Sequence, residues 1–233
     1  MDHIVRSGYL DRMTSADLVA RGLSPSDDLR ARYAAALQPM TPQEEAIVAR
    51  LRGHLAALLR AHWRRASNVE YQVEKTLGIE NEFPHTHGSC IFLPQRLFVQ
   101  PFDRLFKTFV HEFVHVYQRT RPIDTNALLN AWGFKPAALR ERCVRDHNLR
   151  LNPDVNDIIY KDAKGHVELM VYNSDTPKSL LDAHNVVIEF DSSVRIGVAD
   201  SRKEHPYELM AYTLADVLVD GIVDSECETW LRL

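Results

Sequence analysis

Two histidines and a glutamate near the middle of the chain have the types and spacing that could hold a metal ion and use it. His111, Glu112 and His115 form an H-E-x-x-H pattern. On a helix, residues four apart lie one above the other, so the two imidazoles would be spaced to hold one zinc ion. Glu112 would flank that face, where its carboxylate could reach a water at the metal without being a ligand. That is the position a general base needs.

The segment around this pattern predicts a buried helix. Pro101 opens it and Pro122 prevents its continuation. Polar side chains in a mostly apolar helix are costly unless they are paired or bound to something, which favours a metal over an isolated core histidine. Gln118 follows His111 on the same side and is a candidate partner for a ligand histidine. The apolar positions are Phe106, Phe109, Val110, Phe113, Val114 and Tyr117.

Length and composition bound the remaining classes of function. The chain has 233 residues, 45% of them hydrophobic and 26% charged, which is ordinary for a globular protein. A net charge of −4 without a basic block gives no sign of nucleic-acid binding. No secretory signal and no run of ~20 apolar residues is present, so we expect an intracellular, cytoplasmic protein without a membrane partner. Cys90, Cys143 and Cys227 are far apart, which predicts buried free thiols in a reducing compartment.

The motif resembles the active-site helix of a known clan. His-Glu-Phe-Val-His-Val-Tyr-Gln at 111–118 is similar to the metal-binding helix of the zincin metallopeptidases, and Ile-Phe-Leu-Pro at 91–94 is similar to a strand of compact members. The resemblance covers residues 69–221. It implies an α+β zincin-like core with a small mixed sheet, Zn²⁺ as cofactor and a peptide or protein substrate. We therefore expect an N-terminal helical segment at 1–66 and a metallopeptidase domain at 67–233.

A third metal ligand must come from elsewhere in the chain. Metzincins place a histidine six residues after the second one, where this chain has Arg121, so that subclass is excluded. Glu208 is the strongest candidate, because Pro206 predicts a helix that carries Glu208 in its first turn and runs to about Val219. This arrangement resembles the gluzincins, although the separation from His115 is longer than compact members show. The competing candidates are Glu141, His147, His166, Glu168, Glu189 and Glu204.

Further residues are candidates for contacts with a substrate. Tyr212, one turn after Glu208, and His205 are candidate oxyanion donors. The strand that contains Ser89, Cys90 and Ile91 could be an edge strand that pairs with an extended peptide, and an ordinary sheet strand fits these residues equally well. For His85 and His87, a second metal pair is possible, but we favour surface or gating histidines because they precede a strand on a loop rich in turn residues.

The elements that must position these residues follow from caps and periodicity. We expect helices at 14–21, 26–37, 41–62, 125–132 and 136–144. We expect strands at 69–74, 89–93, 157–161, 166–173, 186–190 and 194–198, with residues 81–88 as a loop and 162–165 as a hairpin turn. The favoured function is a zinc-dependent peptidase. The alternatives are a zinc hydrolase of another amide bond and an inactive zincin fold that serves as a structural or peptide-binding scaffold.

Overall fold

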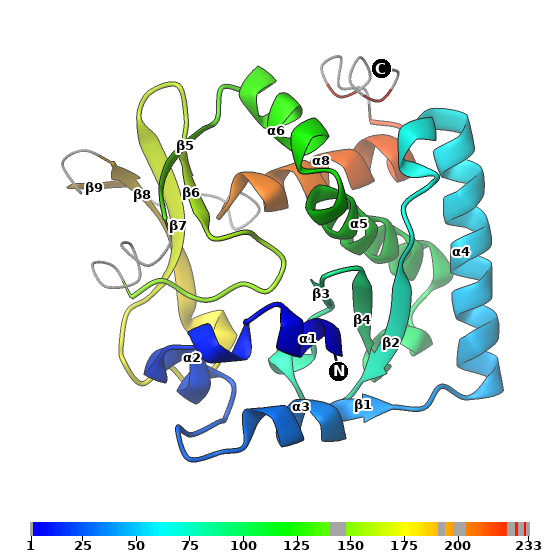
Figure 1. The fold of residues 1–233 in the computed structure, drawn as a ribbon, viewed down its shortest axis with the longest axis horizontal. Coiled ribbons are helices and arrows are strands. Elements are labelled where there is room, and N and C mark those ends of the chain that lie inside the picture. The colour runs from blue at the N-terminus through cyan, green and yellow to red at the C-terminus, as the bar shows by residue number, and fades with distance from the viewer. Residues whose placement is uncertain are drawn as a thin grey trace. The chain divides into compact units, whose positions relative to one another are not determined.

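The computed structural model describes residues 2–139, 148–190, 194–197 and 204–222, together with Cys227 and Leu231. Figure 1 shows the helices and strands in chain order. The α-helices are α1 (Asp2–Arg6), α2 (Ser15–Ala20), α3 (Leu29–Ala36), α4 (Pro42–His62), α5 (Phe102–Thr120), α6 (Pro122–Ala131) and α8 (Pro206–Asp220). The strands are β1 (Leu37–Gln38), β2 (Gln72–Thr76), β3 (His85–His87), β4 (Cys90–Pro94), β5 (Lys135–Leu139), β6 (Ile158–Lys161), β7 (His166–Tyr172), β8 (Ala183–Glu189) and β9 (Val194–Gly197).

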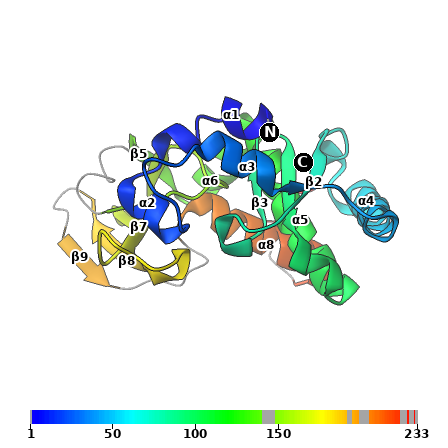
Figure 2. The same cartoon turned by 90° about the horizontal axis from the view of Figure 1, so that it is seen from below.

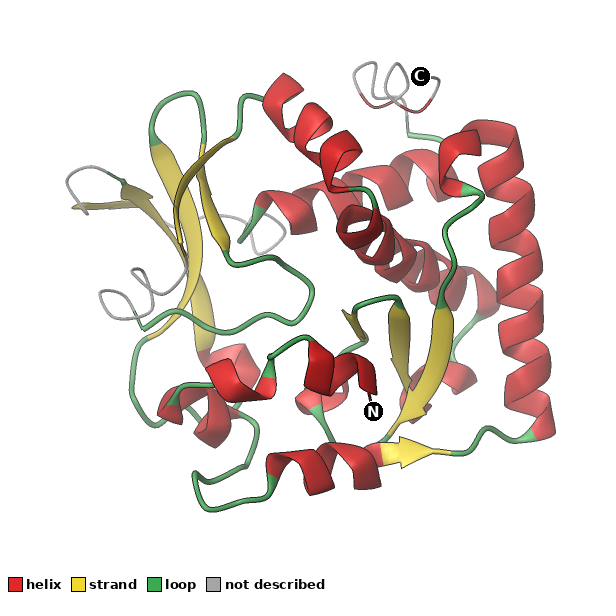
Figure 3. Cartoon of the chain, viewed as in Figure 1, coloured by secondary structure: helices red, strands yellow, loops and turns green. Residues whose placement is uncertain are grey.

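The chain forms two compact units that are interleaved along the sequence. The first consists of Met1–Ser7, Arg30–Pro122 and Met210–Leu233, and the second of Gly8–Leu29 and Ile123–Leu209. This division differs from the expected boundary near residue 66, because the N-terminal helices do not form a unit of their own. Both units contain helices and strands, so the expected α+β class is confirmed. Figure 3 colours the chain by these kinds of element.

A four-stranded sheet and the helices α4 and α5 organise the first unit. The strand order is β1-β2-β4-β3, with β2 and β4 parallel and β3 antiparallel to β4. Helix α5 packs on β3 and β4, and α4 packs on α5. Trp63, at the end of α4, lies against Tyr117 of α5 with ring centroids 4.3 Å apart. A buried aromatic and leucine core therefore holds the metal-motif helix in place.

Local caps account for where several helices begin. The Thr41 hydroxyl accepts a hydrogen bond from the Glu44 N–H, and the Glu44 carboxylate accepts one from the Thr41 N–H. The same reciprocal capping box joins Thr14 and Asp17 at the start of α2. Each box satisfies two backbone N–H groups that the first helical turn would leave without a partner. The predicted helices at 41–62 and 14–21 are confirmed.

The second unit contains two small antiparallel sheets. Strands β5 and β6 form one, and β7, β8 and β9 form the other in that order. Alternating residues of β7 and β8 enclose an apolar cluster that Leu149 and Ile159 complete. Leu129 of α6 packs with Tyr160 and Tyr207 in a separate cluster. The predicted strands β6, β7, β8 and β9 are confirmed within the described residues.

Three predicted elements are wrong. The expected loop at 81–88 contains strand β3, which Gly88, with φ of +57°, turns back onto β4. The expected helix at 136–144 begins instead as strand β5, because pairing with β6 overrides the helix preference of its alanines; residues 140–144 lie outside the described part. Residues 162–165 form a turn, but β6 and β7 pair in different sheets, so they are not a hairpin.

None of the helices in the described part of the chain is long and apolar enough to cross a membrane.

Candidate metal centre

Helix α5 brings the two motif histidines together. His115 is completely buried, and its Nε2 lies 3.1 Å from Nε2 of His111. Residues on the opposite side of α5 fix its rotation, because Phe109 and Phe113 pack edge-on against Tyr71 with centroids 5.9 and 5.4 Å apart. The apolar side chains of α5 therefore hold both imidazoles on the face that the H-E-x-x-H pattern predicts.

A hydrogen bond sets the orientation of the second imidazole. Nδ1 of His115 lies 2.9 Å from Oε1 of Gln118, one turn along α5. An amide oxygen can only accept, so Nδ1 carries the proton and Nε2 presents its lone pair towards His111. A metal-binding histidine needs this tautomer. The predicted partnership of Gln118 with a motif histidine is confirmed.

Glu208 completes a three-residue group. It lies in the first turn of α8, where we expected it, and its carboxylate is buried. His111, His115 and Glu208 each offer one ligand atom, and these atoms lie within 4.8 Å of one another. Among the described residues this is the one group of three or more potential ligands that could hold a metal ion.

Contacts along two helices of the first unit show how α8 approaches α5. His111 lies against Tyr212 with ring centroids 4.4 Å apart, and Lys107 binds Asp216 at 2.6 Å and also binds Asp220. Contacts that lie earlier along α5 have partners that lie later along α8, so the two helices run antiparallel. Both helices are seen from below in Figure 2. The hydrogen bonds that Lys107 donates to the two carboxylates raise its pKa, which keeps its ammonium group charged.

The predicted base and the first oxyanion candidate lie on the same helices as the ligands. Glu112 is 2% exposed and adjoins His111 on α5. The ring of Tyr212 is 38% exposed and covers one side of His111. Tyr212 is thus at the metal group, and its action as a hydrogen-bond donor stays a prediction.

His205 is wrong as an oxyanion candidate. Its Nε2–H donates to the carbonyl of Ile158 at 2.9 Å, and its Nδ1 accepts from the N–H of Tyr207 at 3.1 Å. Both ring nitrogens are therefore engaged within the protein, and the side chain is buried. His205 instead caps the start of α8, which is a structural role.

The competing third ligands lie outside the metal group. Glu204 is close to Glu208 in sequence, but its carboxylate binds the guanidinium of Arg150 at 2.5 Å and the amide of Asn152. That amide also donates to Oε1 of Glu208 at 2.8 Å. The contact of Asn152 with Glu208 was not predicted, because the sequence before Pro153 indicates only a turn at this position. The other competitors also fall outside the group or, like Glu141 and His147, outside the described residues.

Of the two alternatives for the strand with Ser89, Cys90 and Ile91, the edge strand is wrong and the ordinary sheet strand is confirmed. Strand β4 lies between β2 and β3, with Cys90 opposite both Gln72 and His87. Its backbone groups are used on both sides, so β4 has no free edge for a peptide. The edge position belongs to β3, which was not predicted as a strand.

His85 and His87 are buried, so their assignment as surface histidines is wrong. Both project from β3 against Phe92 of β4, with His85 stacked on that ring at 5.1 Å. No third ligand joins them among the described residues, which leaves the alternative of a second metal pair without support.

The separation of the two imidazoles fits a tetrahedral metal site. Metal–nitrogen distances of about 2.0–2.1 Å in a tetrahedral site place two ligand nitrogens about 3.3 Å apart. The 3.1 Å between the two Nε2 atoms is close to this value.

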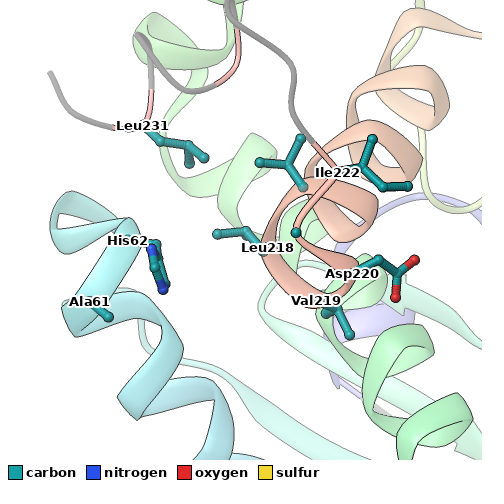
Figure 4. A pocket seen from close by; sticks show the side chains of 9 residues that line it. Ala61, His62, Leu218, Val219, Asp220, Ile222 and Leu231 are labelled. Atoms are coloured by element: carbon teal, nitrogen blue, oxygen red, sulfur yellow. The ribbon is translucent and has the colours of Figure 1, made fainter.

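A separate pocket of about 600 Å³ lies at the ends of α4 and α8 (Figure 4). His62 and Leu218 face each other across it, and Asp220 at its rim is held by Lys107. The lining is mainly aliphatic and includes none of the three metal-group residues. This pocket is therefore not the chemical site.

Comparisons with known proteins give no family or function for this chain, so the assignment of the metal site rests on its geometry. No protein-family model matches the chain, and comparisons with curated proteins and with solved structures found no match either.

Proposed function

We propose that the protein is a zinc-dependent metallopeptidase of the zincin type, with a gluzincin-like ligand set. The observation that carries the proposal is the convergence of His111, His115 and Glu208 from two antiparallel helices. The orientation of His115 supports it, because the bond of Nδ1 to Gln118 turns Nε2 towards Nε2 of His111 at 3.1 Å, as in two ligands of one metal.

The donor set favours zinc among the biological metals. Two imidazole nitrogens and one carboxylate oxygen form the three-ligand set of catalytic zinc sites, which keep a fourth position open. Magnesium and calcium prefer all-oxygen sites, and soft metals prefer sulfur. Cys90 is buried in the centre of the sheet on β4, and it is not part of the group.

Each residue then has a distinct role in peptide hydrolysis. Zinc held by His111, His115 and Glu208 would polarise the scissile carbonyl and lower the pKa of water at its open position. The Glu112 carboxylate takes a proton from the attacking water and passes it to the leaving amine. Tyr212 donates a hydrogen bond to the developing oxyanion.

The test compares Glu112→Gln with wild type in zinc content and in digestion of casein and a peptide library. We expect about one zinc per chain in both proteins and loss of cleavage in the variant, because glutamine keeps the shape but cannot accept the proton. Glu80→Gln is the matched control: Glu80 is also 2% exposed, and it binds the hydroxyl of Tyr33 away from the metal group. The control should cleave like wild type.

Two results would contradict the proposal. Cleavage that survives in Glu112→Gln would remove the assigned base. Zinc binding without chelator-sensitive cleavage in wild type would indicate a zincin-like scaffold without peptidase activity, and mass spectrometry of the products would reveal hydrolysis of another amide.

A further inference from the structure

The amide of Asn152 bridges two buried carboxylates of the second unit. Its Nδ2 donates to Oε1 of Glu208 at 2.8 Å and also to Oε1 of Glu204. Its Oδ1 accepts from the N–H of Asp154 at 2.8 Å, which fixes the side chain in an Asx turn. All functional groups of this side chain are therefore engaged, and its donor side is aimed at the candidate metal ligand.

The backbone that leads to Asn152 is held by β7 and by α2. Just before it, Arg150 N–H donates to the Met170 carbonyl at 2.8 Å, which ties the segment to β7. The next residue, Leu151, is then held by α2: its N–H donates to Oδ1 of Asp17 at 2.8 Å, and its carbonyl accepts from the guanidinium of Arg21 at 2.9 Å. Two residues of the N-terminal segment, Asp17 and Arg21, thus help to set the position of Asn152.

Asp17 and Arg21 form an ion pair that has little access to water. Their side chains are 1% and 2% exposed, with Nη1 of Arg21 3.3 Å from Oδ1 of Asp17. Two hydroxyls complete the cluster: Tyr172 donates to Asp17 at 3.3 Å, and Arg21 donates to the hydroxyl of Tyr9 at 2.6 Å. Burial and the negative charge of Asp17 raise the pKa of Tyr172, so its hydroxyl stays protonated and donates.

Charge balance supports a positioning role for this cluster. Two carboxylates meet one neutral amide, and the cation that offsets them is Arg150, which binds Glu204 at 2.5 Å. Burial lowers the pKa of Arg150, but the negative charge of Glu204 outweighs burial and raises it, so the guanidinium stays charged. The guanidinium of Arg150 thus interacts electrostatically with both Glu204 and Glu208.

We propose that Asn152 is a positioning residue for the metal ligand Glu208, and that the buried Asp17–Arg21 pair of the α2 segment positions Asn152. The N-terminal segment at residues 8–29 is then a structural part of the metal centre, and its removal would weaken metal binding. This inference rests on the proposed metal site, and it is tested by metal affinity without any need for peptidase activity.

The first test is Asn152→Asp in the full-length chain, with zinc affinity measured by chelator competition. Aspartate keeps the acceptor for Asp154 N–H, but it cannot donate to two carboxylates. We expect zinc to bind at least about tenfold more weakly, which is the usual effect of losing a partner of a metal ligand. The visible spectrum of the cobalt-substituted protein should also change, which reports the ligand geometry directly.

Asn156→Asp is the matched control for this change. Asn156 has the same turn, accepting from Ile158 N–H at 3.1 Å, and its amide donates to the hydroxyls of Tyr160 and Tyr207 at 3.0 and 2.9 Å. Hydroxyl groups can reverse and donate to an aspartate, whereas carboxylates cannot. Asn156→Asp should therefore bind zinc within about twofold of wild type and keep its cobalt spectrum.

The second test is Asp17→Asn, which removes the charge that holds Arg21 and Leu151. Asp182→Asn is its control, because Asp182 closes a capping box with Ser179 in the same unit but is exposed and has no contact with Leu151. We expect weaker zinc binding by several-fold in Asp17→Asn and no change in Asp182→Asn. If Asp17→Asn does not fold, Arg21→Lys is the alternative variant. Lysine keeps the positive charge but cannot contact Asp17 and the Leu151 carbonyl at once as the guanidinium does.

The outcomes separate this inference from the proposed function. Absence of zinc binding in wild type would refute the metal site itself. If zinc binding is lost in His115→Ala but unchanged in folded Asn152→Asp, the metal site is supported. The proposed role of Asn152 is then overturned. Weak binding in Asn152→Asp, with unchanged affinity in folded Asp17→Asn and Arg21→Lys, would overturn the role of the N-terminal segment.

Discussion

Replacement of Gln118 by methionine tests whether the oriented lone pair of His115 matters for metal binding. Methionine has a similar length and suits a buried site, so the change removes an acceptor at 2.9 Å without opening a large cavity. The hydrogen bond lies in a fully buried environment, where such a loss costs about 1–2 kcal/mol. If the bond acts mainly in the metal-bound form, zinc affinity should fall about 5- to 30-fold.

The assay is competition with a chromophoric chelator at fixed pH. Gln118→Glu should restore affinity to at least the wild-type value, because a carboxylate accepts from the same Nδ1–H and makes the imidazole a stronger ligand. Gln72→Met is the control, since Gln72 contacts a ring nitrogen of His3 at the surface at 3.3 Å. Unchanged zinc affinity in folded Gln118→Met would refute the reasoning that this bond selects the metal-binding tautomer.

Two further predictions concern stability. Removal of metal by a chelator should lower the melting temperature by about 5–10 °C at zinc concentrations a hundredfold above Kd, since binding then adds about 2.7 kcal/mol, and calorimetry of Glu208→Ala should show a smaller shift. At Glu44, burial raises the pKa, but hydrogen bonds from Lys75 and the Thr41 N–H outweigh this effect and lower it. This stabilisation should therefore be present above the unfolded pKa of about 4.3 and be lost as pH falls through the lower folded value. Urea titrations should show that the free energy of unfolding falls less between pH 5 and 3 in Glu44→Gln than in wild type. Equal losses in the two proteins would contradict the stabilising role of the Glu44 carboxylate.

Features that depend on neighbouring residues were predictable from the sequence. Three such features act within one or two helical turns: the capping boxes at Thr14 and Thr41, the prolines at the two ends of α5, and the helical spacing of the motif. Glu208 was also predictable, because Pro206 fixes the start of α8 and so its first turn. These elements carry all three residues of the metal group.

Features that depend on long-range pairing were not predictable. Strand β3 has only three residues, and its identity comes from pairing with β4 after the turn at Gly88. The same pairing buries His85 and His87 and removes the edge of β4. Strand β5 is extended because it pairs with β6, although its own alanines favour a helix. The contact of Asn152 with Glu208 joins residues 56 positions apart, and no local pattern encodes it.

The two sides of the metal group consequently differ in what holds them. The histidine side is contained in a single helix: His111, His115 and Gln118 keep their spacing wherever α5 is formed, and the buried aromatic face of α5 sets their direction. The glutamate side depends on hydrogen bonds that begin in α2 and pass through Leu151 and Asn152. Two histidines on a helix bind zinc weakly, and a third protein ligand gives the affinity and open geometry of a catalytic site. Because the third ligand depends on long-range contacts, a completed centre requires the fold of both the N-terminal segment and the segment around Asn152.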